Sequence, residues 1–126
     1  MTDQIADLLV RIKNAAAVRR HELVMPYTKM KEAILKILET NGFVKNINVV
    51  EEKEKKYIKF ELVATKTPSH IKQISKPGHR IYTKGKDIKI PLRGLGLVII
   101  STSAGVINAK EASKKGLGGE LICEIW

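Results

Sequence analysis

Residues 96–106 read GLVIISTSAGV, an apolar run that passes directly into small hydroxyl-bearing residues and a glycine. The aliphatic stretch Leu97–Ile100 is the clearest strand signal in the chain. Upstream of it, glycine and proline interrupt the apolar pattern often enough to predict short strands at 71–75, 80–82 and 88–91. With a further apolar strand expected at 121–126, these segments predict a mainly β module in the second half of the chain.

A short helix is expected within this β module. Asn108, with Glu111 three residues later, resembles a capping box, in which both side chains satisfy backbone N–H groups at the start of a helix. Gly116 is suited to follow the last helical turn. The sequence therefore predicts a helix from Asn108 to Lys115.

Two amphipathic helices are expected in the first third of the chain. Apolar residues spaced by three and four predict one over residues 3–18, with Thr2 or Asp3 as its N-cap. Thr28 is suited to cap a second helix, which should end at Asn41-Gly42, where glycine accepts a left-handed backbone. Both helices need a partner surface on which to bury their apolar stripes.

A hairpin is expected to supply that surface. Residues 43–50 and 57–63 are rich in β-branched and aromatic residues and flank the charged stretch 51–56, which is typical of a solvated hairpin tip. The polar segment 65–69, interrupted by Pro68, is the best candidate for a boundary.

The fold class predicted from these patterns is α+β. Residues 1–65 are expected to form an N-terminal α/β module with two helices on a small sheet. Residues 66–126 are expected to form a mainly β module with one short helix.

The charge of the chain is strongly positive and unevenly distributed. Lys and Arg total 23 against 13 Asp and Glu, a formal net charge of +10. Residues 66–93 alone carry eight cationic side chains and a single acidic one. An excess of this size favours association with a polyanion, and its concentration in the β-rich half argues against a basic amphipathic membrane helix.

The usual enzymatic constellations are missing from the sequence. Gly94-Leu95-Gly96 begins a dinucleotide fingerprint, but Ile99 replaces the third glycine and no helix is expected to follow. The histidines lack carboxylates or cysteines at metal-ligand spacing. Cys123 lies in an apolar run and is more typical of a small core residue than of a nucleophile. The sequence therefore predicts no catalytic site, no metal and no cofactor.

The basic stretch is the first candidate binding surface. Its cations recur every three or four residues across predicted strands and turns, and Asp87 alone opposes them. An ordinary solvated surface usually mixes signs, so phosphate binding is favoured. Within this stretch Lys76 and Arg80 are predicted to contact phosphates, and Tyr82 is the one aromatic residue suited to a base or sugar contact.

The residues Ser101, Thr102 and Ser103 form the second candidate site. Each hydroxyl can donate one hydrogen bond and accept two, and Gly105 nearby lets backbone approach a ligand. A Ser/Thr turn that satisfies its own backbone is an equally physical reading. The glycine run 116–119 before Glu120 is ambiguous in the same way.

The chain resembles bacterial ribosomal protein eight of the small subunit. The resemblance is carried by residues 96–106, by GLGGELIC at 116–123, by IADLLVRIKN at 5–14 and by SKPGHRIY at 75–82, and it extends over essentially the whole chain. It implies an N-terminal α/β module, a C-terminal mainly β module and no enzymatic activity.

The resemblance also implies a primary binder of the central domain of small-subunit ribosomal RNA that acts early in assembly, in the cytoplasm. Family members place the Ser-Thr-Ser loop in the minor groove of an irregular RNA helix and commonly repress an operon messenger that mimics this site. Small-subunit proteins five and seventeen are the expected neighbours, and no membrane is involved. Carried over by position, the resemblance assigns base and sugar contacts to Ser101, Thr102 and Ser103, with Gly118, Gly119 and Glu120 close by. The expected RNA-binding set also includes Lys76, Arg80 and Tyr82 of the basic stretch, and Lys29 and Lys31.

The chain departs from the family pattern at a few positions. Gln4 stands where proline is frequent, His79 where an apolar residue is frequent, and Ala104 where a basic residue often occurs. The last difference removes one phosphate contact without altering the hydroxyl residues. From the residues alone, a peripheral polyanion or membrane-surface binder is the alternative function, and a small enzyme is the third.

Overall fold

The computed structural model describes residues 3–126, which divide into two compact units. One unit joins Met1–Leu9 to Ser69–Trp126, and the other comprises Val10–Pro68. Helices and antiparallel sheets occur together, so the predicted α+β class is confirmed. The division of the chain into modules of residues 1–65 and 66–126 stays a prediction.

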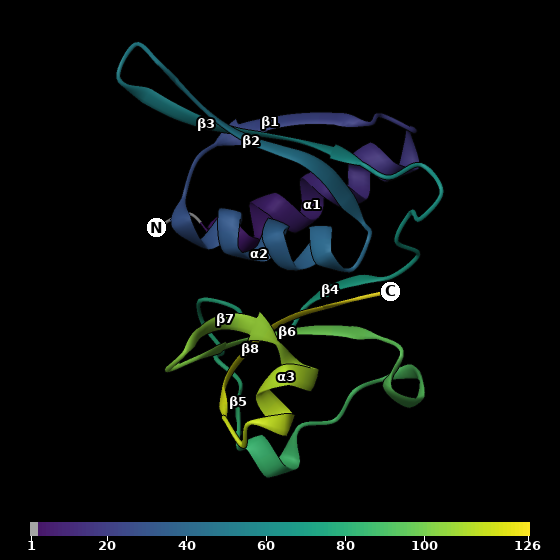
Figure 1. Ribbon diagram of the computed structural model, residues 1–126, viewed down its shortest axis with the longest axis vertical. Helices are drawn as coiled ribbons and strands as arrows, with labels where there is room; N and C mark the ends of the chain where they lie inside the picture. The colour runs from purple at the N-terminus through teal and green to yellow at the C-terminus, as the bar shows by residue number, and fades with distance from the viewer. Residues whose placement is uncertain (1–2) are drawn as a thin grey trace. The chain divides into compact units, whose positions relative to one another are not determined.

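The unit of residues 10–68 is built on a three-stranded antiparallel sheet in the order β1-β3-β2. Its strands are β1 (Glu22–Pro26), β2 (Val44–Glu52) and β3 (Lys55–Leu62). Helix α2 (Lys29–Thr40) and the later turns of α1 (Gln4–Ala17) lie on one face of the sheet (Figure 1). The predicted hairpin is confirmed, because β2 and β3 pair up to Glu52 and Lys55 at the tip.

The period-2 pattern of β3 explains how this sheet is covered. Ile58 and Phe60 are buried, whereas Lys59 between them is exposed. Met25 of β1 pairs with Ile58 and is also fully buried. The buried residues of α2 complete the core on this side, and they include Ile34, Leu35 and Leu38.

Side-chain caps begin the two long helices as the sequence predicts. Asp3 Oδ1 accepts hydrogen bonds from the backbone N–H groups of Ile5 and Ala6, at 3.1 and 3.2 Å, while Thr2 lies outside the described residues. Thr28 Oγ1 accepts one from the N–H of Lys31, at 3.2 Å. These bonds satisfy donors that have no partner within the first helical turn.

The unit that contains residues 69–126 is a five-stranded antiparallel sheet with β8 at its centre. Strand β6 pairs with one edge of β8, and β4 and β5 pair in turn with the other, while β7 extends the sheet beyond β6. The strands are β4 (Ile71–Gln73), β5 (Tyr82–Thr83), β6 (Leu97–Thr102), β7 (Gly105–Asn108) and β8 (Gly119–Ile125).

Helix α3 (Ala109–Lys114) packs against β6 and β7 and closes a core around Val98 and Ile100. Asn108 caps it as predicted, because its Oδ1 accepts a hydrogen bond from the N–H of Lys110 at 3.0 Å. Glu111 accepts a bond from Lys115 Nζ at 2.9 Å, an i,i+4 pair on the exposed side of the helix.

The strand predicted at 88–91 is wrong. This segment runs without strand pairing between two single 3-10 turns, η1 (Gly85–Asp87) and η2 (Leu92–Gly94). Ile88 and Ile90 nevertheless pack on the core beneath α3, and Pro91 has no N–H with which to continue a ladder. The apolar residues that predicted a strand at 88–91 are therefore explained by their burial against the core, without strand pairing.

Candidate nucleic-acid interface

Three strands bring separately predicted site residues together at one end of the five-stranded sheet. Glu120, near the start of β8, pairs with Ser101 of β6 on one side and with Tyr82 of β5 on the other. The preceding residue, Gly119, begins β8 and pairs with Thr102. Paired residues that lie 17 to 38 positions apart in sequence are thus neighbours at this end of the sheet.

The hydroxyl loop contains two kinds of side chain. Thr102 Oγ1 accepts a hydrogen bond from the N–H of Ala104 at 3.1 Å and donates one to the carbonyl oxygen of Gly105 at 3.0 Å. Within residues 3–126, the hydroxyls of Ser101 and Ser103 bond to nothing. The self-satisfied turn therefore applies to Thr102 and not to the two serines, and a ligand contact at either serine stays a prediction.

Close packing against neighbouring backbone requires glycine at the two positions before Glu120. A Cβ added to Gly119 would lie 2.0 Å from the carbonyl oxygen of Ser101, and one added to Gly118 would lie 2.5 Å from that of Thr83. Both distances are to backbone, which cannot move aside as the end of a flexible side chain can. Glycine at these positions lets β8 approach its neighbours beside the hydroxyl loop.

Charged and aromatic side chains lie within this row and beside it. Arg80 Nη1 lies 3.2 Å from Glu120 Oε2, so that arginine and this carboxylate form an ion pair. The pair is partly exposed, with 42% of the Arg80 side chain accessible to solvent. Tyr82 is 70% exposed, which leaves its ring accessible for stacking.

Ser75 holds the loop that carries Lys76 and Arg80, a role that sequence patterns did not indicate. Ser75 is buried, and its Oγ accepts a hydrogen bond from the N–H of Ile81 at 2.9 Å and lies 3.3 Å from the carbonyl oxygen of the same residue. Lys76 and His79 exchange backbone bonds of 3.0 and 2.9 Å across the turn. The side chain of Lys76 is exposed at the edge of this fixed loop.

Five of the six other cations among residues 66–93 are exposed and form no side-chain hydrogen bond within the described part of the chain, whereas Lys66 Nζ donates to the carbonyl oxygen of Asn41. The five are Lys72, Lys84, Lys86, Lys89 and Arg93. The structure assigns no salt bridge to any of these five side chains within residues 3–126. Their charge is therefore available to phosphate groups.

The two lysines predicted in α2 differ in environment. Lys29 is exposed, whereas Lys31 is only 4% exposed and its Nζ donates a hydrogen bond to the carbonyl oxygen of Pro26 at 3.0 Å. The Lys31 ammonium is thus already hydrogen-bonded to the backbone of the turn that precedes α2. An RNA contact at either lysine stays a prediction.

Burial accounts for the chemistry of the lone thiol. Cys123 is fully buried in β8, and this burial, with a smaller contribution from the charge of Glu124, raises its pKa to about 12. A thiol with that pKa is protonated at neutral pH and is a poor nucleophile. No cluster of potential metal ligands occurs among residues 3–126, and no helix there is long and apolar enough to cross a membrane.

Known proteins resemble this chain over its full length. The family model described as ribosomal protein S8 matches residues 3–126. The small ribosomal subunit protein uS8 of Dictyoglomus thermophilum is 49% identical over 130 residues, an alignment that covers 100% of this chain and 98% of the relative. The proteins of the same name from Staphylococcus haemolyticus and Streptococcus equi subsp. zooepidemicus are 41% and 42% identical with the same coverage.

Proposed function

The chain belongs to the ribosomal protein S8 family, whose members are structural components of the small ribosomal subunit and not enzymes, and from this premise we propose that it binds small-subunit ribosomal RNA directly. Its target is the central domain of that RNA, which it binds early in assembly. It acts within ribosomes of the cytoplasm.

The observation that carries this proposal is the row of Ser101, Glu120 and Tyr82 beside the unbonded hydroxyl of Ser103. The minor groove of an A-form RNA helix is wide and shallow, and it is lined by 2′-hydroxyl groups. Short hydroxyl side chains on a tight hairpin suit such a groove, since they can both donate to and accept from a 2′-hydroxyl. An adjacent exposed tyrosine adds a stacking surface.

The exposed cations supply affinity in this proposal, and the hydroxyl loop supplies discrimination. Contacts with phosphate position a protein on any RNA, whereas contacts with base edges and sugars depend on the sequence and shape of the groove. The same surface would bind an operon messenger that mimics the ribosomal site. Small-subunit proteins five and seventeen are the proposed neighbours in the particle.

Filter binding of the purified chain to ribosomal RNA fragments tests the proposal. We expect tighter binding to a fragment of the central domain than to unrelated structured RNA of equal length, by about 1,000-fold or more at physiological salt. Anionic lipid vesicles provide the control for simple charge attraction. Equal affinity for both RNAs, or binding to vesicles as tight as to the central domain, would contradict the proposal.

Lys76→Ala is expected to weaken binding to cognate and unrelated RNA alike. Loss of one phosphate contact should flatten the dependence of log affinity on log salt by up to about one unit. Titrations at several salt concentrations measure this slope. Lys55→Ala at the β2–β3 hairpin is the matched control and should leave the slope unchanged, whereas an unchanged slope in Lys76→Ala would remove Lys76 from the interface.

A further inference from the structure

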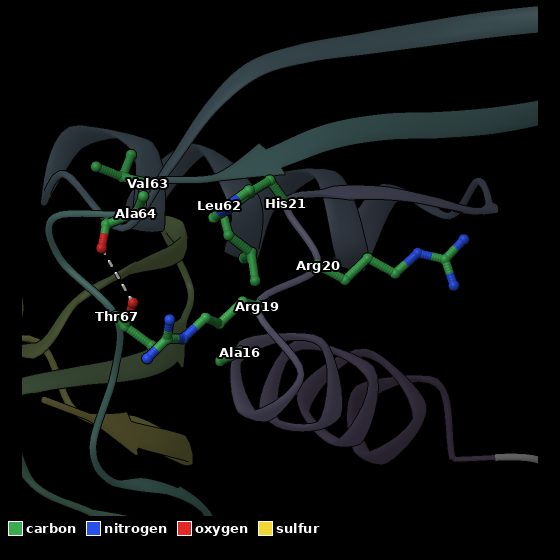
Figure 2. Close-up of a pocket in the computed structure, with 8 residues that line it drawn as sticks. All are labelled: Ala16, Arg19, Arg20, His21, Leu62, Val63, Ala64 and Thr67. Atoms are coloured by element: carbon green, nitrogen blue, oxygen red, sulfur yellow. Dashed lines mark hydrogen bonds between the residues drawn. The ribbon is translucent and has the colours of Figure 1, made fainter.

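A pocket of about 480 Å³ lies within the unit of residues 10–68, where the end of α1 meets the segment that follows β3 (Figure 2). None of the residues on the proposed RNA-binding row borders it. Pockets of roughly 300 to 1,000 Å³ are the usual size for small organic ligands. The space is therefore large enough for a nucleotide and far too large for a single ion.

Backbone hydrogen bonds hold the rim of the pocket in place. Arg19 has a left-handed backbone, with φ of 57°, and its N–H bonds to the carbonyl oxygen of Ala16 at 3.3 Å. The N–H of Arg20 bonds to Ala15 at 2.8 Å, which turns the chain back after the helix. The N–H of Leu62 then bonds to the carbonyl oxygen of His21 at 2.7 Å and ties this turn to the end of β3.

The lining combines aliphatic side chains with a cation and a hydroxyl. Ala16, Leu62 and Val63 present aliphatic surface, whereas Arg19 contributes a guanidinium and Thr67 a hydroxyl. None of the eight residues that line the pocket is acidic. Within residues 3–126, the Arg19 side chain forms no salt bridge, so its charge is not already neutralised.

The two arginines at the rim differ in direction. In Figure 2 the Arg19 side chain extends across the pocket toward Thr67, whereas the Arg20 side chain points away from it. Arg19 is thus the residue placed to meet an anionic group of a ligand. Arg20, with the same charge one position later, provides a matched control.

We propose that this pocket binds a single nucleoside 5′-monophosphate unit, with the base against the aliphatic wall and the phosphate on the guanidinium of Arg19. Guanidinium groups bind phosphate through paired N–H donors, and bases that are splayed out of RNA bind in pockets with apolar or planar walls. The inference rests on the proposed RNA binding and deepens it, because an unpaired nucleotide of RNA supplies this unit. A free nucleotide has the same chemistry.

The test is an amide-resolved NMR titration of the full chain with adenosine 5′-monophosphate, with a short unpaired oligoribonucleotide and with inorganic phosphate. We expect the two nucleotide probes to shift the amides of residues 16–21 and 62–67 saturably, and phosphate alone to bind at least about tenfold more weakly. A stronger response to the oligoribonucleotide than to the mononucleotide identifies RNA as the source.

Arg19→Gln should weaken the binding of both nucleotides about tenfold, and Arg20→Gln should leave it within about twofold. An unchanged, well-dispersed spectrum verifies that each variant is folded. Should Arg19→Gln fail to fold, Arg19→Lys serves instead, since it keeps the charge but loses the paired donors and should weaken binding by a smaller factor.

Three outcomes would overturn the inference: no shifts around the pocket, phosphate binding as tightly as the nucleotide, or equal losses in the Arg19 and Arg20 variants. The mononucleotide titration does not depend on ribosomal RNA. If the nucleotides cause no shifts around the pocket while binding to the central domain is intact, only the pocket proposal is contradicted. If the nucleotides cause these shifts but the chain does not bind the central domain, only the proposed function is contradicted.

Discussion

Gly119→Ala is expected to lower the free energy of unfolding by about 3 kcal/mol or more, the upper range for overpacking at a closely packed site. The new Cβ would lie 2.0 Å from the carbonyl oxygen and 2.9 Å from the carbonyl carbon of Ser101. Because both atoms belong to the backbone of β6, relief requires the central pairing of the sheet to open. Thermal unfolding should show a fall in Tm on the order of 10 °C.

Gly78→Ala is the matched control for this prediction. A Cβ at Gly78 would meet nothing within 4 Å, and its backbone is not left-handed. Its Tm should remain within a few degrees of that of the unmodified chain. If Gly119→Ala unfolds at the same temperature as Gly78→Ala, the close approach of β6 and β8 at Ser101 is incorrect.

The elements that the sequence predicted best are those determined by neighbours along the chain. Caps at Asp3, Thr28 and Asn108 involve side chains and N–H groups two or three residues apart, so their chemistry is visible in a short window. The uninterrupted apolar run of β6 is equally local. These features needed no knowledge of the tertiary structure.

The two strands that escaped prediction depend on partners far away in the chain. Strand β1 carries Glu22 and Pro26 at its ends and exposes Val24, and it forms because β3 offers it a complete pairing partner. Strand β7 is a short edge strand that begins at Gly105, and within residues 3–126 its one pairing partner is β6. At five and four residues, both strands are too short for their apolar residues to show a period of two along the chain.

Site geometry was the least visible from sequence. The pairing of Glu120 with Ser101 and Tyr82 follows from sheet register, which the intervening loop lengths do not determine. The burial of Lys31 follows from its place on the inner side of α2, and it separates this lysine from the exposed Lys29 despite their spacing of two residues. Residue type and charge indicated the candidate residues, whereas the register of the sheet determines which of them lie side by side.

Simultaneous replacement of Ser101 and Ser103 with alanine is expected to reduce the preference for cognate over unrelated RNA by roughly 30-fold or more. The two hydroxyls have no partner within residues 3–126, so their loss leaves the fold intact and deprives buried RNA groups of hydrogen bonds, at about 1 to 3 kcal/mol per unsatisfied group. The slope of log affinity against log salt should not change, because no cation is removed. Competition binding with both RNAs measures the effect.

Two further variants separate recognition by the loop from its stability. Ser113→Ala, on the exposed side of α3, should change neither preference nor stability. Thr102→Val removes the hydroxyl that accepts from Ala104 and donates to Gly105, so it should lower the free energy of unfolding by about 1 to 2 kcal/mol. If the double serine variant keeps its full preference for cognate RNA while Thr102→Val is destabilised, the loop is a structural turn and discrimination comes from other residues.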